Sequence, residues 1–505
     1  MKKIFIITAI CLGAVSCNLD IIPRTQYSEG NVEVTTDDSG SENQYSTRED
    51  MEGLRNSIYD SWIKDIQEKG YMDYLVSTEC RADNAYNGSP STGEIVEIET
   101  NNIASNNGNV SRDWDWYLGQ ISNVNQIICN IDAVRDAAGS ELTEAEYKQW
   151  KSEALTWRAF NLARMAQLWG GAPMTLTVPP AINAQNVEQV YELYFPKMSS
   201  AETVYKQAIE DLEYAVQNGP GVNPANKFLL SKAFAAGLLA RIYAEPGSLQ
   251  DWGKVESYCK DVEGMGFELE PDYADLWGYD PGDGGDAKRN SRESIFEVTW
   301  SRDQGNWLWM MFHRNAYSPE DSYSWAKWIT PSRDLVKAYD AAGDAVRKNA
   351  SIIYDACTWS LYYPEDNYAF MHKMPTNATS VIVMRLAEIY LLHAEALAKG
   401  GDLSGATGYV NKTRGRAGLS GIAQPASEEE MINAILDERR LELAFEGFRF
   451  YDLVRHGKAA SVAASVAAGD SYWRTRVPLT DETILFPVPL SAMEKNPNLQ
   501  QNPGY

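Results

Sequence analysis

Aromatic side chains that suit a sugar ligand gather in one stretch of the chain. Six of the 15 Trp lie between residues 300 and 359, within an irregular region of about residues 265–380 that is rich in Gly, Asp and Pro. Indole and phenol rings pack on the apolar C–H face of a sugar, while polar side chains bond its hydroxyl groups. The pattern predicts a binding surface on loops. Its aromatic candidates are Trp277, Trp307, Trp309, Tyr323 and Trp325.

A second candidate set is polar. Arg81, Asp83 and Asn84 lie in the segment CRADNAYNGSPSTGE, whose Gly, Asn, Ser and Pro residues predict a loop. Guanidinium, carboxylate and amide groups are suitable partners for ligand hydroxyl groups. We therefore expect these three side chains to contact the ligand.

Core packing is the alternative for each single Trp, because Trp is heavily buried on average. Trp114 and Trp157 stand at helical spacing and are assigned to the core. Trp300 stands in a predicted strand and fits either role. For the aromatic group as a whole, we expect at least one ring to touch the ligand.

Residues that would support catalysis lack the necessary spacing. The four His are scattered, and none forms a metal-binding pair such as H-E-x-x-H. DPGDGGD at residues 280–286 has Asp residues at the spacing of a cation loop, but the twelfth position holds Ser291, so a solvated turn is predicted. We expect no enzyme activity, cofactor or metal. With 70 acidic residues, a glycoside hydrolase with an unrecognised carboxylate pair stays open as an alternative.

The chain is acidic and long enough to bury a large core. Its 505 residues are 44% hydrophobic and carry a net charge of −25. No basic run offsets this charge, so we expect no nucleic-acid partner.

The first residues predict a secreted lipoprotein. MKK precedes an apolar stretch that is too short to span a bilayer as a mature helix, and AVSC at residues 14–17 resembles a lipobox. We expect a signal peptide over residues 1–16, lipidation of Cys17, and a polar tether or surface arm over residues 18–50. Four further Cys lack metal-binding spacing and are either buried thiols or disulfides: Cys80, Cys129, Cys259 and Cys357.

Helices must hold the candidate loops in place. Apolar residues repeat every four positions over residues 51–67, and residues 386–399 and 403–416 read as a helical hairpin. From residue 200 onward, small residues recur between large ones, as closely stacked helix pairs require. ESIFEVTW at residues 293–300 is the best strand. We predict a mainly α single domain over residues 51–505: tetratricopeptide-like hairpins as a scaffold, with a loop-rich lobe that has a few short strands.

Residues 432–457 mix charges and aromatic rings along one predicted helix. A helix this aromatic must bury most of its surface, and buried ions persist only when paired. The helical spacing predicts three pairs: Arg439 with Glu442, Glu446 with Arg449, and Asp452 with Arg455 or His456. Gly447 within the helix suggests that another backbone packs closely there.

Taken together, motifs along the whole chain resemble the SusD-like (RagB/SusD) family of Bacteroidetes outer-membrane lipoproteins. They are CNLDIIP at residues 17–23, the helix with Trp114, Tyr117, Ile121 and Asn125, the segment from Arg158 to GGAPM at residues 170–174, ESIFEVTW at 293–300, RLAEIYLLHAEA at 385–396, NKTRGRAGL at 411–419, ERRLELAFEGFRFYDLVR at 438–455, FPVP at 486–489 and QNPGY at 501–505.

This resemblance implies a fold, a location and a task. It implies helical hairpins that support an irregular binding lobe, and attachment through Cys17 to the outer membrane, facing the cell exterior. It also implies a SusC-like TonB-dependent transporter as partner, which would receive a glycan or its oligosaccharides. Because binding residues vary in this family, the candidate residues are placed by region only. A peptide- or protein-binding importer lipoprotein is the other alternative, since the same family includes peptide importers.

Overall fold

The computed structural model describes residues 45–88, 92–279, 287–318, 328–357 and 361–505. Several predicted features lie outside the described residues: the signal peptide, Cys17, most of the tether, the Asp-rich loop at residues 280–286, Tyr323 and Trp325.

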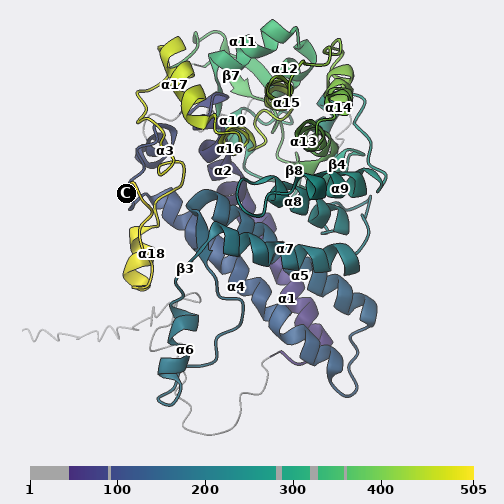
Figure 1. Ribbon diagram of the computed structural model, residues 1–505, viewed down its shortest axis with the longest axis vertical. Helices are drawn as coiled ribbons and strands as arrows, with labels where there is room; N and C mark the ends of the chain where they lie inside the picture. The colour runs from purple at the N-terminus through teal and green to yellow at the C-terminus, as the bar shows by residue number, and fades with distance from the viewer. Residues whose placement is uncertain (1–44, 89–91, 280–286, 319–327, 358–360) are drawn as a thin grey trace, which may run out of the picture.

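Long helices lie side by side in the lower body of the molecule (Figure 1). They pack in the order α1 (Arg48–Asp65), α4 (Gly108–Asp136), α5 (Glu144–Trp169) and α7 (Ala201–Asn218). The series continues through α8 (Lys232–Ala244), α9 (Trp252–Glu263), α13 (Leu386–Lys399), α14 (Leu403–Arg416) and α15 (Glu428–Glu442). α13 and α14 have the bounds predicted from the sequence. The predicted mainly α fold with stacked helical hairpins is confirmed.

Shorter elements complete the described chain. They are η1 (Ile66–Met72), α2 (Asp73–Leu75), η2 (Val76–Cys80), α3 (Gly93–Glu99), α6 (Val187–Tyr194), η3 (Tyr273–Leu276), α10 (Trp309–Phe312), α11 (Arg333–Ala342), α12 (Ala345–Ser351), α16 (Arg449–Arg455), α17 (Ala459–Gly469) and α18 (Leu490–Lys495).

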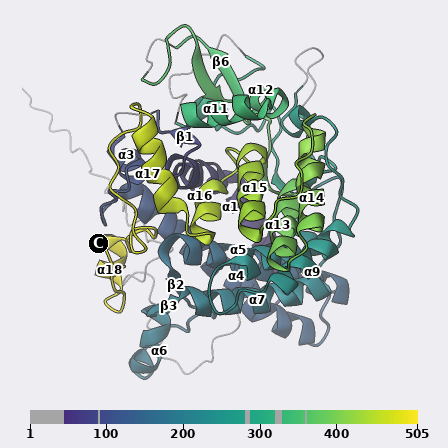
Figure 2. The ribbon, with the colours of Figure 1, turned by 45° about the horizontal axis from the view of Figure 1, so that its top comes forward.

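The strands are short and occur in antiparallel pairs. Within the described ranges they are β1 (Ala85–Tyr86) with β5 (Thr330–Pro331), β2 (Gly171–Pro173) with β3 (Met198–Ser200), β4 (Ser294–Val298) with β8 (Val381–Arg385), and β6 (Ile352–Asp355) with β7 (Tyr368–Met371). β4 lies inside the strand predicted over residues 293–300. In Figure 2, β6, α11 and α12 form a separate layer at the top, beyond the ends of α15 and α16.

Local signals explain where the scaffold helices begin and end. Thr47 and Thr143 cap α1 and α5. In each case the Thr hydroxyl accepts from the backbone N–H of an acidic residue three positions later, and the carboxylate of that residue accepts from the Thr backbone N–H. α5 ends at Gly170, whose φ of 76° lies in the left-handed region that glycine adopts readily. These caps satisfy backbone groups that a helix end leaves unpaired.

A glycine in α8 lets the scaffold pack closely against the β4–β8 strand pair. A Cβ atom at Gly237 of α8 would lie 2.3 Å from the Met384 sulfur on β8, so a larger residue would require the Met384 side chain to move. The close contact joins the helical scaffold to the strand that precedes α13. The loop-rich lobe is thus carried directly on the helices.

The prediction of one continuous helix over residues 432–457 is wrong. α15 ends at Glu442, and α16 begins at Arg449. Between them Phe445 and Gly447 have φ values of 64° and 85°, which interrupt the helix. A Cβ atom at Gly447 would lie 2.6 Å from the Tyr74 ring. Close packing at Gly447 does occur, but against an aromatic side chain rather than a backbone.

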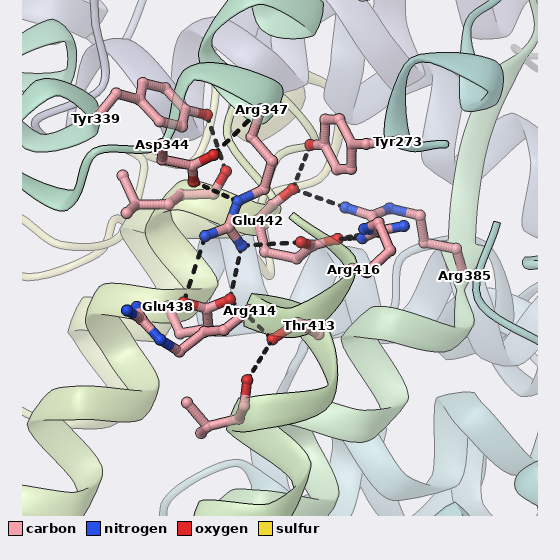
Figure 3. A network of polar contacts seen from close by, with 12 residues as sticks. Tyr273, Tyr339, Asp344, Arg347, Arg385, Thr413, Arg414, Arg416, Glu438 and Glu442 are labelled. Atoms are coloured by element: carbon pink, nitrogen blue, oxygen red, sulfur yellow. Dashed lines mark hydrogen bonds and ion pairs between the residues drawn. The ribbon is translucent and has the colours of Figure 1, made fainter. Parts of the chain in front are cut away.

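The ions of this segment are paired, as predicted, but most of them have other partners (Figure 3). Glu442 is fully buried, and its Oε1 accepts from Arg385 Nη1 at 2.6 Å, while its Oε2 accepts from Arg347 Nη1 at 2.9 Å. Arg416 also bonds Glu442. Burial alone would raise the pKa of Glu442, but these three guanidinium groups hold it well below its ordinary value.

Only one of the three predicted pairs forms. Arg455 Nη2 donates to Asp452 Oδ1 at 2.8 Å. Arg439 pairs with Asp452 instead of Glu442, at 2.7 Å from Nε to Oδ2. Glu446 and Arg449, which were predicted to pair with each other, bond Arg385 and Asp83 respectively. The break in the helix removes the spacing between Glu446 and Arg449. Arg439 and Glu442 keep their helical spacing within α15, but arginines from other elements bond Glu442 instead.

Three further properties bear on the predictions. None of the helices in the described part of the chain is long and apolar enough to cross a membrane. No group of three or more potential ligand side chains is placed to hold a metal ion within the described ranges. Cys80 and Cys259 are buried free thiols, Cys129 is an exposed one, and Cys357 is also buried.

Candidate functional site

Trp307 and Trp309 lie on a turn whose backbone is held by a buried amide. The Asn306 Nδ2 donates to the carbonyl oxygens of Asn377 at 2.9 Å and Thr379 at 3.0 Å, and Asn306 is only 3% exposed. The backbone N–H of Asn306 donates to Asn377 as well, at 2.7 Å. These bonds join the turn to the segment that leads into β8.

A second anchor comes from the N-terminal helices. The backbone N–H of Trp307 donates to Gln67 Oε1 of η1 at 2.9 Å. Leu308 and Phe312 are fully buried, and the Phe312 ring meets Tyr71 edge to face at 6.3 Å. The turn therefore has one side fixed in the core.

Trp307 and Trp309 are themselves half-buried. Both pack against the main core, so part of each side chain is fixed and part reaches solvent. Trp328 is half-buried on the same core, and its backbone N–H donates to the Met311 carbonyl at 3.0 Å. The structure thus joins three of the Trp in the loop-rich region to a single element, α10. Tyr323 and Trp325, the other predicted platform residues of this region, are outside the described ranges.

A neighbouring aromatic pair was not among the predicted site residues. The rings of Tyr279 and Tyr317 meet edge to face at 6.1 Å, and the Arg302 guanidinium lies 4.2 Å from the centre of the Tyr317 ring. Both tyrosines are half-buried, and Arg302 is exposed. The aromatic composition of the region is the sequence signal that would identify the two tyrosines as candidate ligand-binding residues. The arginine has no such signal in the sequence.

The predicted polar cluster is in the interior, which corrects the expectation that it contacts ligand. Arg81 is fully buried and donates to Asn101 Oδ1 at 3.1 Å, to the Thr483 carbonyl at 2.9 Å and to the Ile484 carbonyl at 3.1 Å. Its guanidinium also lies 4.3 Å from the centre of the Phe450 ring. Arg81 therefore ties the C-terminal segment to the scaffold.

Asp83 and Asn84 belong to the same interior network. Arg449 donates to both Asp83 carboxylate oxygens at 2.8 Å. Asn84 bonds Glu79 at 2.8 Å and Arg440 at 3.0 Å. Burial would raise the pKa of Asp83, but Arg449 and Arg440 hold it at about 2. Asp83 is 2% exposed and Asn84 is 0% exposed, so neither side chain can reach a surface ligand.

Trp277 is also a core residue, contrary to the prediction. It is 5% exposed and meets Tyr273 edge to face at 5.3 Å. The Lys373 ammonium lies 4.3 Å from the centre of its ring. Burial lowers the pKa of that lysine to about 8. Trp277 thus helps to enclose a buried charge.

The three remaining Trp of the sequence analysis are buried. Trp114 and Trp157 are each 1% exposed, which confirms their assignment to the core. Trp300, which fitted either role, is 4% exposed and also belongs to the core. Among the described Trp candidates, Trp307 and Trp309 keep an exposed portion.

Two family models match the chain. Residues 36–244 match the model described as "Starch-binding associating with outer membrane", and residues 363–505 match the model described as "SusD family". A SusD-like protein of Bacteroides ovatus is 24% identical over 494 residues, which cover 90% of this chain and 82% of the relative.

Solved structures share the fold. The surface glycan-binding protein A of Bacteroides fluxus has a TM-score of 0.72 at 24% identity, covering 91% of this chain and 100% of that one. A laminarin-binding SusD-like protein has a TM-score of 0.70 at 21% identity, again with 91% and 100% coverage. Given the two family models and these relatives, the chain belongs to the SusD-like (RagB/SusD) family.

Proposed function

We propose that the protein binds a polysaccharide or its oligosaccharides at the cell surface, without catalysing a reaction, and delivers them to a SusC-like TonB-dependent transporter. Trp307 and Trp309 form the platform, together with Tyr323 and Trp325. Cys17 carries the lipid that holds the protein at the outer membrane, facing the exterior.

The observation that carries this proposal is the half-exposed pair Trp307 and Trp309 on a turn held by Asn306. Binding a flexible glycan costs less when the protein side of the contact is already ordered. The buried amide bonds and the Gln67 contact order this turn before any ligand arrives. An indole that is fixed on one side and open on the other offers the apolar face that a sugar ring requires.

The comparisons support the same chemistry. The family model over residues 36–244 is described as starch-binding, and the two similar structures are titled as glycan- and laminarin-binding proteins. That description also associates the family with the outer membrane, which agrees with a lipid on Cys17. The transporter partner rests on family membership.

Affinity electrophoresis of leaderless protein through gels that contain single glycans tests the proposal. We expect at least one glycan to retard the wild type, and Trp307→Ala, Trp309→Ala and Trp325→Ala to reduce that retardation. Trp252→Ala is the matched control, because Trp252 is also half-buried on the core but lies at the start of α9. Retardation by no glycan, together with tight binding of a peptide, would overturn the proposal in favour of a peptide importer.

The absence of catalysis is tested separately. The retarding glycan, cut to oligosaccharides, is incubated with the protein and its products are separated by chromatography. We expect the oligosaccharide profile to stay unchanged. New shorter products that disappear in a carboxylate variant would establish a glycoside hydrolase instead.

A further inference from the structure

A cavity of about 70 Å³ lies in the helical scaffold, and none of the proposed glycan-platform residues lines it. Its walls come from α2, α5, α7, α8, α13, α15 and α16 and from the turn between α15 and α16. Aromatic rings form part of the wall: Tyr74, Phe160, Tyr205, Phe448 and Tyr451. A single water needs roughly 10–15 Å³ of such space, so the cavity accepts several waters or one small ligand group.

Arg164 is a cation without a carboxylate partner in this wall. Its guanidinium stacks 3.7 Å from the centre of the Tyr74 ring and donates to Gln167 Oε1 at 3.1 Å. Within the described ranges, no acidic side chain forms an ion pair with it. By contrast, the other three cavity arginines are neutralised. Arg241 pairs with Glu388 at 2.6 Å, Arg439 with Asp452 at 2.7 Å and Arg455 with Glu395 at 2.8 Å. Burial, with the charge of Arg241, lowers the pKa of Arg164 to about 9.

Two more polar groups at this cavity lack partners. Tyr451 is 5% exposed, and its hydroxyl makes no hydrogen bond to any described residue. Arg439 is 3% exposed, and its Nη1 is likewise without a partner among them. Native proteins seldom leave buried donors unsatisfied, so such atoms point to a missing partner. Here both belong to the wall of one cavity that also contains the unneutralised Arg164.

The charges in the wall select the kind of partner. Its four guanidinium groups are Arg164, Arg241, Arg439 and Arg455. Glu388, Asp452 and the adjoining Glu395 pair with the last three, which leaves the positive charge of Arg164 and the carboxyl group of Glu245. Glu245 forms no ion pair with the other described residues, and burial raises its pKa to about 7 despite the nearby Arg455. Guanidinium and hydroxyl donors with one excess positive charge complement a monoanionic oxygen acceptor better than a dianion.

We propose that this cavity is a binding site for the carboxylate of a small organic acid. The carboxylate bonds Arg164 and the Tyr451 hydroxyl, and the rest of the acid packs between the aromatic rings of the wall. Two sources offer this chemistry at this size: a small hydroxy acid such as glycolate, and an aliphatic acid such as acetate. The site is separate from the proposed glycan platform, so it stands or falls independently of that function.

Isothermal titration calorimetry of the leaderless protein with glycolate, acetate and neutral acetamide tests the site. We expect at least one acid to bind with one-to-one stoichiometry and the neutral amide to give no saturable heat. The acid that binds more tightly identifies the source. Absence of saturable heat with both acids at millimolar concentration would overturn the proposal.

Two variants test the assignment of the donors. Arg164→Met keeps the apolar stem on Tyr74 but removes the charge, and should weaken acid binding by about tenfold or more, as expected for a charge-assisted bond. Tyr451→Phe removes only the unpartnered hydroxyl and should weaken it severalfold, with no loss of thermal stability. Arg135→Met is the matched control, because Arg135 also stacks on a tyrosine, 4.2 Å from the centre of the Tyr147 ring, outside the cavity.

These variants also separate a real site from a chance one. Acid affinity unchanged in both Arg164→Met and Tyr451→Phe would place the acid elsewhere and overturn the proposal. Acid affinity unchanged in Trp307→Ala is expected, because the two sites share no residue. Circular dichroism of each variant shows whether the fold is kept, and Tyr451→Phe provides the answer if Arg164→Met does not fold.

Discussion

Arg385 Nη1 donates to Glu442 Oε1 at 2.6 Å, although the two residues are 57 positions apart in the chain. Arg385 ends β8, and Glu442 ends α15. The same Arg385 guanidinium group donates to Glu293 Oε1 at 2.6 Å, just before β4. One buried ion pair therefore joins the strand pair of the loop-rich lobe to the last scaffold helices.

Glu442→Ala tests how much this ion-pair network contributes to the free energy of unfolding. Three guanidinium groups would lose a buried counter-charge, so we expect the free energy of unfolding to fall by about 3–5 kcal/mol. Urea unfolding followed by circular dichroism measures it. Glu428→Ala is the control, because Glu428 pairs with Lys399 at 2.6 Å on the exposed surface and should cost less than about 1 kcal/mol. Equal losses in the two variants would contradict the structural role of the network.

Asp83→Asn should destabilise the protein in a pH-dependent way. The folded-state pKa of Asp83 is about 2, against 3.8 for the unfolded chain, so its stabilising charge is fully present above pH 3.8 and is lost as the pH falls toward 2. This pKa difference alone corresponds to about 2.5 kcal/mol. We expect the difference in unfolding free energy between wild type and variant to be constant near neutral pH and to shrink below pH 4. The exposed Asp60, changed to Asn, should show no such trend.

Gly447→Ala tests the break between α15 and α16. The added Cβ would lie 2.6 Å from the Tyr74 ring at a φ of 85°, so we expect a loss of about 1–3 kcal/mol in unfolding free energy. Gly408→Ala within α14 is the matched control. No atom lies within 4 Å of its added Cβ, and alanine favours a helix by up to about 1 kcal/mol. A neutral Gly447→Ala would contradict the close contact with Tyr74.

Asn306→Ala should weaken glycan binding without changing any aromatic residue. It removes the two bonds from Nδ2 to the carbonyls of Asn377 and Thr379, which hold the turn that carries Trp307 and Trp309. We expect a loss of affinity comparable to that of Trp309→Ala in affinity electrophoresis, because the platform is no longer ordered before binding. Asn130→Ala is the control, since among the described residues the Asn130 amide donates only to the Gln126 carbonyl, within α4. Full retardation of Asn306→Ala would show that the turn needs no such support.

Local signals in the sequence were enough to predict much of the scaffold. α13 and α14 have the predicted bounds because apolar periodicity, Gly400 and the Asp402 cap all act within a few residues. β4 was predicted for the same reason, since alternation and flanking turn residues are local. The family resemblance also follows from local motifs spread along the whole chain.

The burial and pairing of the ions in residues 432–457 were also predictable, but their partners were not. Local spacing predicted Arg439 with Glu442, whereas the structure pairs Glu442 with arginines from β8, α12 and α14. Spacing along one helix carries no information about residues that another element brings alongside. The left-handed backbone at Phe445 and Gly447 also interrupts the helix between Glu446 and Arg449, so their predicted spacing does not form.

The sequence alone thus determined the helical scaffold, the family and the aromatic region, because these depend on local pattern and composition. Only the tertiary structure decided which candidates face solvent. Arg81, Asp83 and Asn84 look like loop residues in the sequence, yet residues near the C-terminus enclose them. Thr483 accepts from Arg81, Arg449 neutralises Asp83, and Arg440 donates to Asn84. Trp307 and Trp309 keep exposed portions because Asn306 and Gln67 hold their turn at the edge of the core. Exposure depends on long-range packing, which no local pattern records.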